Sequence, residues 1–62
     1  MTESLKQIII TSLWLRKNII ETGDPYLSAN DAQNQGLKVN ALHEDQMKLM
    51  LKINKLIRIL EK

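Results

Sequence analysis

Apolar residues recur through the C-terminal half of the chain at the spacing of an α-helix. Counting back from Leu60 in alternate steps of four and three residues gives a heptad seam with one polar interruption, at Gln46. The apolar members of this seam are Val39, Leu42, Leu49, Ile53, Leu56 and Leu60. Met50 and Ile57 lie beside the seam and widen the apolar arc to roughly 120°. An arc of this width is typical of a helix in a bundle, and it predicts a helix over residues 29–61.

A second amphipathic helix is predicted near the N-terminus, over residues 4–21. Its apolar residues follow helical spacing and leave only a narrow polar strip. They are Leu5, Ile8, Ile9, Leu13, Leu15, Ile19 and Ile20. Thr2 or Ser4 is expected to cap its start, because a side-chain oxygen there can accept a hydrogen bond from a free backbone N–H. Gly23 favours the left-handed conformation that ends helices, and Pro25 cannot continue the helix.

The stretch that precedes the heptad seam is ambiguous. Ser28 is expected to be the N-cap of the next helix. Gly36 and the nearby asparagines weaken that helix, by about 1 kcal/mol for the glycine relative to alanine. The register of the seam nevertheless favours one continuous helix over residues 29–61. The alternative is a break near residues 36–40, after which Asn40 would cap a final helix.

Neither apolar face can remain in water, so the two helices are expected to fold back on each other about a loop at residues 22–28. The predicted fold is all-α, a single helical-hairpin domain over residues 1–62. One hairpin still leaves several apolar side chains uncovered, and each one that is buried elsewhere contributes ~1.5–3 kcal/mol. A homodimer that forms a four-helix bundle is the simplest arrangement that covers them. The predicted oligomer interface consists of Ile9, Leu13, Ile20, Leu42, Leu49, Ile53, Leu56 and Leu60.

The composition leaves few other sources of stability. A chain of 62 residues buries only about 60% of the surface that its unfolded form exposes. It has no cysteine and no phenylalanine, so disulfides are excluded and aromatic filling of a core is sparse. A homo-oligomer, with a dimer as first choice, or a protein partner is therefore expected to complete the core. The lack of cysteine fits the cytoplasm, and the apolar run at residues 8–15 is far shorter than the ~20 residues that span a bilayer.

The sequence contains no recognisable catalytic or cofactor site. His43 is the single histidine, and one imidazole forms neither a metal site nor a catalytic triad. Beside Glu44 and Asp45, near a helix start, it is expected to cap the helix or to face solvent. The two glycines stand apart, so no phosphate-binding loop is present. We therefore expect no enzymatic activity, no cofactor and no metal.

Charged residues and remaining apolar residues suggest where partners bind. Arg16 lies within the apolar arc of the first helix, where an unpaired charge is costly. It is interpreted either as a contact that sets partner specificity or as a charge that reaches the edge of the bundle. A basic stripe in a segment without acidic residues supplies candidate nucleic-acid contacts, namely Lys48, Lys52, Lys55 and Arg58. Candidate contacts to a protein partner are Trp14, Arg16, Tyr26, Met47 and Leu51.

These patterns predict a small oligomeric helical protein with an interaction or regulatory role, which binds another protein through faces of its bundle. The alternative is a nucleic-acid-binding helical-hairpin dimer that uses the basic stripe. A cationic chain that lies on membranes is a third and less favoured interpretation. The formal net charge of +2 is too small to decide among them.

Overall fold

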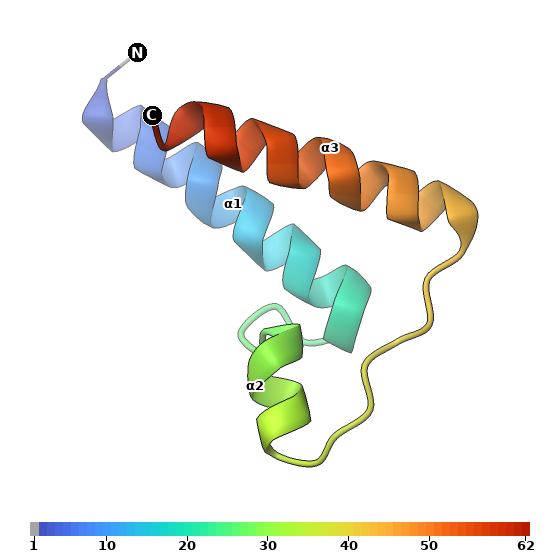
Figure 1. Ribbon diagram of the computed structural model, residues 1–62. Coiled ribbons are helices and arrows are strands. Elements are labelled where there is room, and N and C mark those ends of the chain that lie inside the picture. The colour runs from blue at the N-terminus through green and yellow to red at the C-terminus, as the bar shows by residue number, and fades with distance from the viewer. Residues whose placement is uncertain (1) are drawn as a thin grey trace.

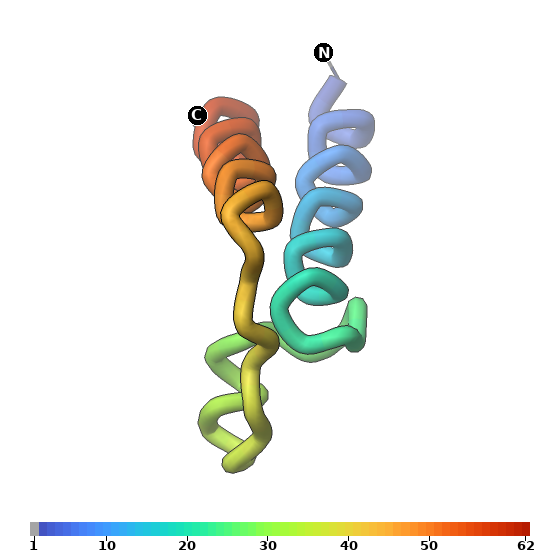
Figure 2. The backbone as a smooth tube through the Cα atoms, turned by 90° about the vertical axis from the view of Figure 1, so that its right-hand side faces the viewer, coloured from blue at the N-terminus to red at the C-terminus, as the bar shows by residue number. Residues whose placement is uncertain are grey.

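Two long antiparallel helices and one short helix make up the fold (Figure 1). The computed structural model describes residues 2–62, in which α1 spans Glu3–Thr22, α2 spans Ala29–Asn34 and α3 spans Glu44–Leu60. No strand occurs in these residues. α1 and α3 lie side by side with the two chain ends at the same end of the pair, and α2 lies near the other end (Figure 2). The prediction of an all-α fold is confirmed.

The ends of α1 follow from residues that the sequence marks. Thr2 is the N-cap, and its Oγ1 accepts a hydrogen bond from the N–H of Leu5 at 3.2 Å. Gly23 has a φ of +82°, and its N–H donates to the carbonyl oxygen of Ile19 at 2.9 Å. This left-handed residue stops the helix, as the sequence predicts.

The prediction of one continuous helix over residues 29–61 is wrong. α2 ends at Asn34, and a segment without helical structure follows until α3 begins at Glu44. Gly36 adopts a φ of +76°, its N–H donates to the carbonyl of Gln33, and the N–H of Leu37 donates to the carbonyl of Ala32. These two bonds form a Schellman motif, which satisfies the last carbonyl groups of α2 and turns the chain away. The alternative of a break near residues 36–40 describes the structure.

Asn40 does not cap α3, contrary to the expectation that accompanied this alternative. Its backbone N–H donates to the carbonyl of Glu21 at 2.7 Å, and its Nδ2 donates to the carbonyl of Ile20 at 3.3 Å. It therefore satisfies two carbonyl groups at the C-terminal end of α1. The N-cap of α3 is His43, whose N–H donates to Oε1 of Gln46 at 3.1 Å. The polar interruption of the seam thus has a capping role.

The core lies between α1 and α3. Three residues of α3 are buried, and Leu13 and Ile20 of α1 pack against them together with Leu42. Those three residues are Met50, Ile53 and Ile57. A second, smaller contact buries Ala32 of α2 against α1, leaving it 1% exposed. At the open end of the hairpin, Nζ of Lys6 donates to the backbone carbonyl of Lys62 at 3.2 Å.

The buried row of α3 is rotated by roughly 50° from the centre of the predicted seam, half of the ~100° step between successive residues. Met50 and Ile57, which the sequence places beside the seam, are buried. Leu49 and Leu56, which the sequence places within it, are 37% and 49% exposed. The hairpin therefore leaves one edge of the apolar arc uncovered. Within residues 2–62, no helix combines the length and apolar character that crossing a membrane requires.

Candidate interaction surfaces

Uncovered apolar side chains are the most prominent surface feature of the protein. In residues 2–62, five residues are buried, whereas twelve large hydrophobic residues are exposed. Scattered exposed apolar residues are normal on a protein surface, but a contiguous group marks an interaction site. The position of these residues relative to one another therefore determines whether they form such a site.

Four of them gather on one side of the α1–α3 contact. On α1, Leu13 and Ile20 mark the side that faces α3, and α2 lies beside the part of the surface that carries Trp14. Leu5 and Ile9 lie on the opposite edge, because successive residues are rotated by about 100°. Both are exposed.

The matching edge of α3 carries Leu49 and Leu56. In an antiparallel pair of helices, edges with the same rotational sense lie on the same side of the contact. Viewed along each helix from its N-terminus, Leu49 and Leu56 lie counterclockwise of the buried row of α3. Leu5 and Ile9 lie counterclockwise of the core side of α1 in the same way. These four residues form what we term the apolar face, on the side of the hairpin away from α2.

The eight residues predicted as an oligomer interface divide into two groups. Leu13, Ile20, Leu42 and Ile53 belong to the core of the single chain, and Leu60 is half-buried. Ile9, Leu49 and Leu56 are exposed and belong to the apolar face. Leu5 was not in the predicted set, although its spacing of four residues from Ile9 is the signal that places it on the same edge.

Arg16 lies within the apolar face on α1, and Lys52 lies at the edge of that face on α3. Arg16 is exposed, and it forms no ion pair with an acidic residue of the described chain. Its position lies on the Ile9 edge of α1, rotated by roughly 20° from Ile9. Lys52 lies next to Leu56 on α3, on the side of Leu56 away from the buried row. The apolar face therefore carries one cation within it and another at its edge.

The candidate partner contacts are all exposed, but they do not form one site. Trp14 lies on α1, and Lys17 Nζ is 4.5 Å from the centroid of its ring, a cation–π contact. Tyr26 lies in the loop after α1, and Met47 and Leu51 lie on α3. Trp14 also borders a hollow of about 360 Å³ between α1 and α2, which sequence reasoning did not anticipate. Its lining is Trp14, Lys17, Asn18, Glu21, Ser28, Ala29 and Asn30.

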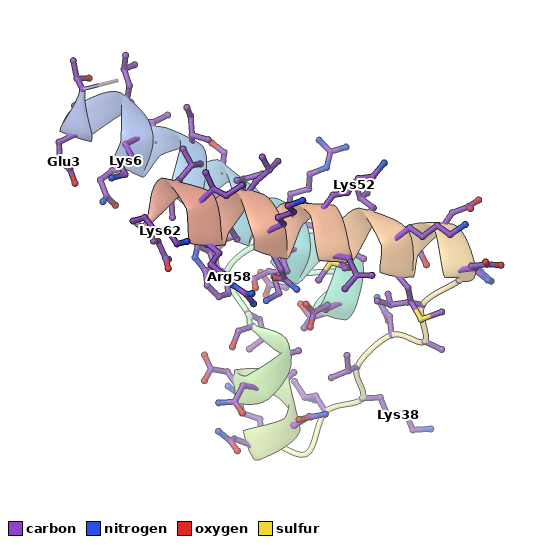
Figure 3. The ribbon with its side chains drawn as sticks, turned by 45° about the horizontal axis from the view of Figure 1, so that its top comes forward. Glu3, Lys6, Lys38, Lys52, Arg58 and Lys62 are labelled. Carbon is purple, nitrogen blue, oxygen red and sulfur yellow. The ribbon has the colours of Figure 1, made fainter. Side chains whose placement is uncertain are left out.

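The side of α3 opposite the core carries most of the cations of the protein. Lys55 lies roughly 170° around the helix from the centre of the buried row. Around it are Leu51 and Ile59, both exposed. We term this surface the outer face, and it consists of Lys48, Leu51, Lys52, Lys55, Arg58, Ile59 and Lys62. In Figure 3, Lys52 and Arg58 project from α3 to different sides, which shows how wide the basic surface is.

The cations of the outer face are largely without acidic partners. The single ion pair in residues 2–62 joins Lys48 Nζ to Glu44 Oε1 at 3.5 Å, and both side chains are well exposed. An exposed pair of this kind contributes little to stability. All four residues predicted as nucleic-acid contacts lie on this face and are exposed.

Groups that bear catalytic or metal-binding chemistry are dispersed. His43 is exposed at the start of α3, as expected of a capping histidine. Asp24 uses Oδ1 to accept a hydrogen bond from the N–H of Tyr26 at 2.9 Å, which holds the loop. Residues 2–62 contain no group of three or more side chains placed to hold a metal ion.

Comparison with known proteins identifies no relative of this chain. No protein-family model, no curated protein sequence and no solved structure matches the chain. The apolar face and the outer face are therefore the features from which a function can be inferred.

Proposed function

We propose that this protein is a small oligomeric helical protein with an interaction or regulatory role, which forms a homodimeric four-helix bundle and binds another protein through the bundle faces. The observation that carries the proposal is the apolar face, a strip of exposed leucine and isoleucine side chains drawn from both long helices. A strip of this kind on two antiparallel helices fits against a second copy of itself. The cysteine-free composition supports a reducing compartment, so we propose the cytoplasm.

The energetics favour a dimer that exchanges with monomer. The four residues are between 37% and 54% exposed. Full burial of such a side chain contributes ~1.5–3 kcal/mol, so covering the eight partly exposed side chains in a dimer contributes roughly 5–11 kcal/mol. The loss of translational and rotational freedom costs an estimated 4–15 kcal/mol. Because these ranges overlap, the dimer is expected to dissociate on dilution, and helicity is expected to fall with it because the core of one hairpin is small.

The test is the mass in solution by light scattering over a range of concentrations, with helicity followed by circular dichroism. Leu56→Asp places a charge in the apolar face and is expected to weaken dimerisation at least tenfold, which corresponds to about 1.4 kcal/mol. Leu51→Asp is the matched control, since it makes the same change on the outer face of the same helix. It is expected to leave the dimer intact.

Two results would contradict the dimer. One is a folded monomer whose helicity does not change with concentration. The other is an equal loss of association in the Leu51→Asp and Leu56→Asp variants, because the apolar face would then have no special part in assembly.

Nucleic-acid binding by the outer face is the second candidate. It is favoured by the absence of an acidic partner within 4.0 Å of Lys52, Lys55 or Arg58 in the described chain. Phosphate contacts release counterions, so such binding would fall steeply as the salt concentration rises. Titration of a short duplex and of a single strand at several salt concentrations tests it. Binding that weakens steeply with salt and is still measurable at ~150 mM would support it, and binding that does not change with salt would contradict it.

A further inference from the structure

We propose that the outer face of α3 binds an acidic amphipathic helix of a partner protein. This inference rests on the proposed function, because it names the chemistry of the protein that the bundle binds. Most of the outer face lies on the side of α3 away from the core, and Lys52 and Ile59 form its edge toward Leu56. A dimer that covers the apolar face therefore leaves Leu51, Lys55 and Arg58 free.

Two exposed apolar residues supply the anchors. Leu51 is 70% exposed and Ile59 is 55% exposed. They are eight residues apart, which is about 12 Å along the helix, or roughly two turns. A bound helix presents its own apolar residues at intervals of three and four, so two of them reach both anchors. The aliphatic part of Lys55 lies between the anchors and extends the apolar strip.

The positive charge around the anchors requires a partner surface with negative charge. Lys48, Lys52, Lys55, Arg58 and Lys62 frame the two anchors, and only Lys48 has an ion-pair partner in the described chain. A partner helix with carboxylates on both sides of its apolar strip places charge opposite each cation. Complementary rim charges raise the association rate and suppress partners of the wrong sign.

The same observations disfavour the two other anionic partners. A phosphate backbone offers no apolar contact to Leu51 and Ile59, and this face has no aromatic side chain on which a base could stack. A membrane-surface helix needs a broad apolar side, whereas the broad apolar side of α3 faces α1. Two apolar anchors surrounded by cations fit an acidic amphipathic helix better than a nucleic acid or a membrane surface.

The test measures binding of a synthetic helical peptide of about five turns (~18 residues) to the full chain. The peptide carries a leucine strip flanked by glutamates, and a sister peptide has glutamine at each glutamate. At ~50 mM salt the acidic peptide is expected to bind at least tenfold more tightly than its sister. Its affinity is expected to fall by about tenfold in Leu51→Ser, in Ile59→Ser and in Lys55→Glu.

Two matched variants control for general changes in the protein. Tyr26→Ser removes an exposed apolar side chain away from the outer face, and Lys38→Glu reverses an exposed cation in the segment before α3 (Figure 3). Both are expected to bind the acidic peptide within about twofold of the original chain, well under the 1.4 kcal/mol of a tenfold change. Circular dichroism of every variant shows whether its helicity is retained.

Three outcomes would overturn the proposal. The acidic peptide fails to bind at low salt, or its binding is unchanged by Leu51→Ser and Ile59→Ser. Alternatively, a DNA duplex or vesicles rich in phosphatidylserine bind more tightly than the peptide and are insensitive to both serine variants. The mass measured on the same samples keeps the two proposals apart, since loss of the dimer overturns the four-helix bundle while peptide binding reports only on the outer face.

Discussion

Single residues decide where each helix of this protein begins and ends. The two left-handed positions are both occupied by glycine, Gly23 at φ +82° and Gly36 at φ +76°. A Cβ added at either position would meet no atom within 4 Å, so only the backbone conformation demands glycine there. The caps at Thr2, Ser28 and His43 are likewise local, and a reader of the sequence can find the first two from residue type alone.

Replacing Gly23 by alanine is expected to lower the free energy of unfolding by about 1–2 kcal/mol, because an L-residue is strained in the left-handed region. The added methyl group causes no steric clash, since no atom lies within 4 Å of its position. Gly23→Asn is the control, and it should lose clearly less because asparagine tolerates this conformation. Urea unfolding at one fixed protein concentration measures both, and equal stability of the alanine variant and the original chain would refute the argument.

At the scale of elements, α3 carries two overlapping apolar rows, and the structure uses only one of them within the chain. The row with Met50 and Ile57 faces α1, while Leu49 and Leu56 form the exposed edge. The sequence shows both rows at helical spacing, and it gives no information about the direction from which α1 approaches. The path of the segment before α3 has a similar origin, because Asn40 is held by carbonyl groups of α1 that are distant in sequence.

The assignment of the buried row leads to a direct stability prediction. Ile57→Ala is expected to lower the free energy of unfolding by about 2–5 kcal/mol, because it removes buried methylene and methyl groups from the core. Leu51→Ala on the outer face should change it by about 0.5 kcal/mol or less. Thermal and urea unfolding of the two variants at the same concentration compares them, and similar losses would show that the row facing α1 has been misassigned.

At the scale of the whole molecule, the chain is two long helices with a core too small to use all of their apolar surface. α2 covers one side of α1, and the apolar face on the other side is uncovered. Arg16 within this face and Lys52 at its edge limit how far apolar contact can extend. A charge on an association surface can restrict the number of copies that assemble, because a closer or wider contact would bury an unpaired cation.

Arg16→Leu tests this role of the charges. The variant is expected to keep or raise the stability of the fold, because Arg16 is exposed and forms no ion pair in residues 2–62. It is also expected to form species larger than a dimer, because the apolar face becomes wider. Light scattering and urea unfolding measure the two effects. A stability loss greater than about 2 kcal/mol would instead assign Arg16 a structural role.

The sequence by itself determined the all-α class, the bounds of α1 to within one residue at each end, the start of α2 and the role of Gly23, and it narrowed the N-cap of α1 to Thr2 or Ser4. These features depend on helical periodicity and on caps, which act between residues at most four or five positions apart. The tertiary structure decided which apolar row of α3 is buried, that Asn40 binds the end of α1, and that a hollow forms between α1 and α2. Each of these needs the relative placement of helices, which is set by packing and hydrogen bonds between residues far apart in the chain, and no local pattern encodes it.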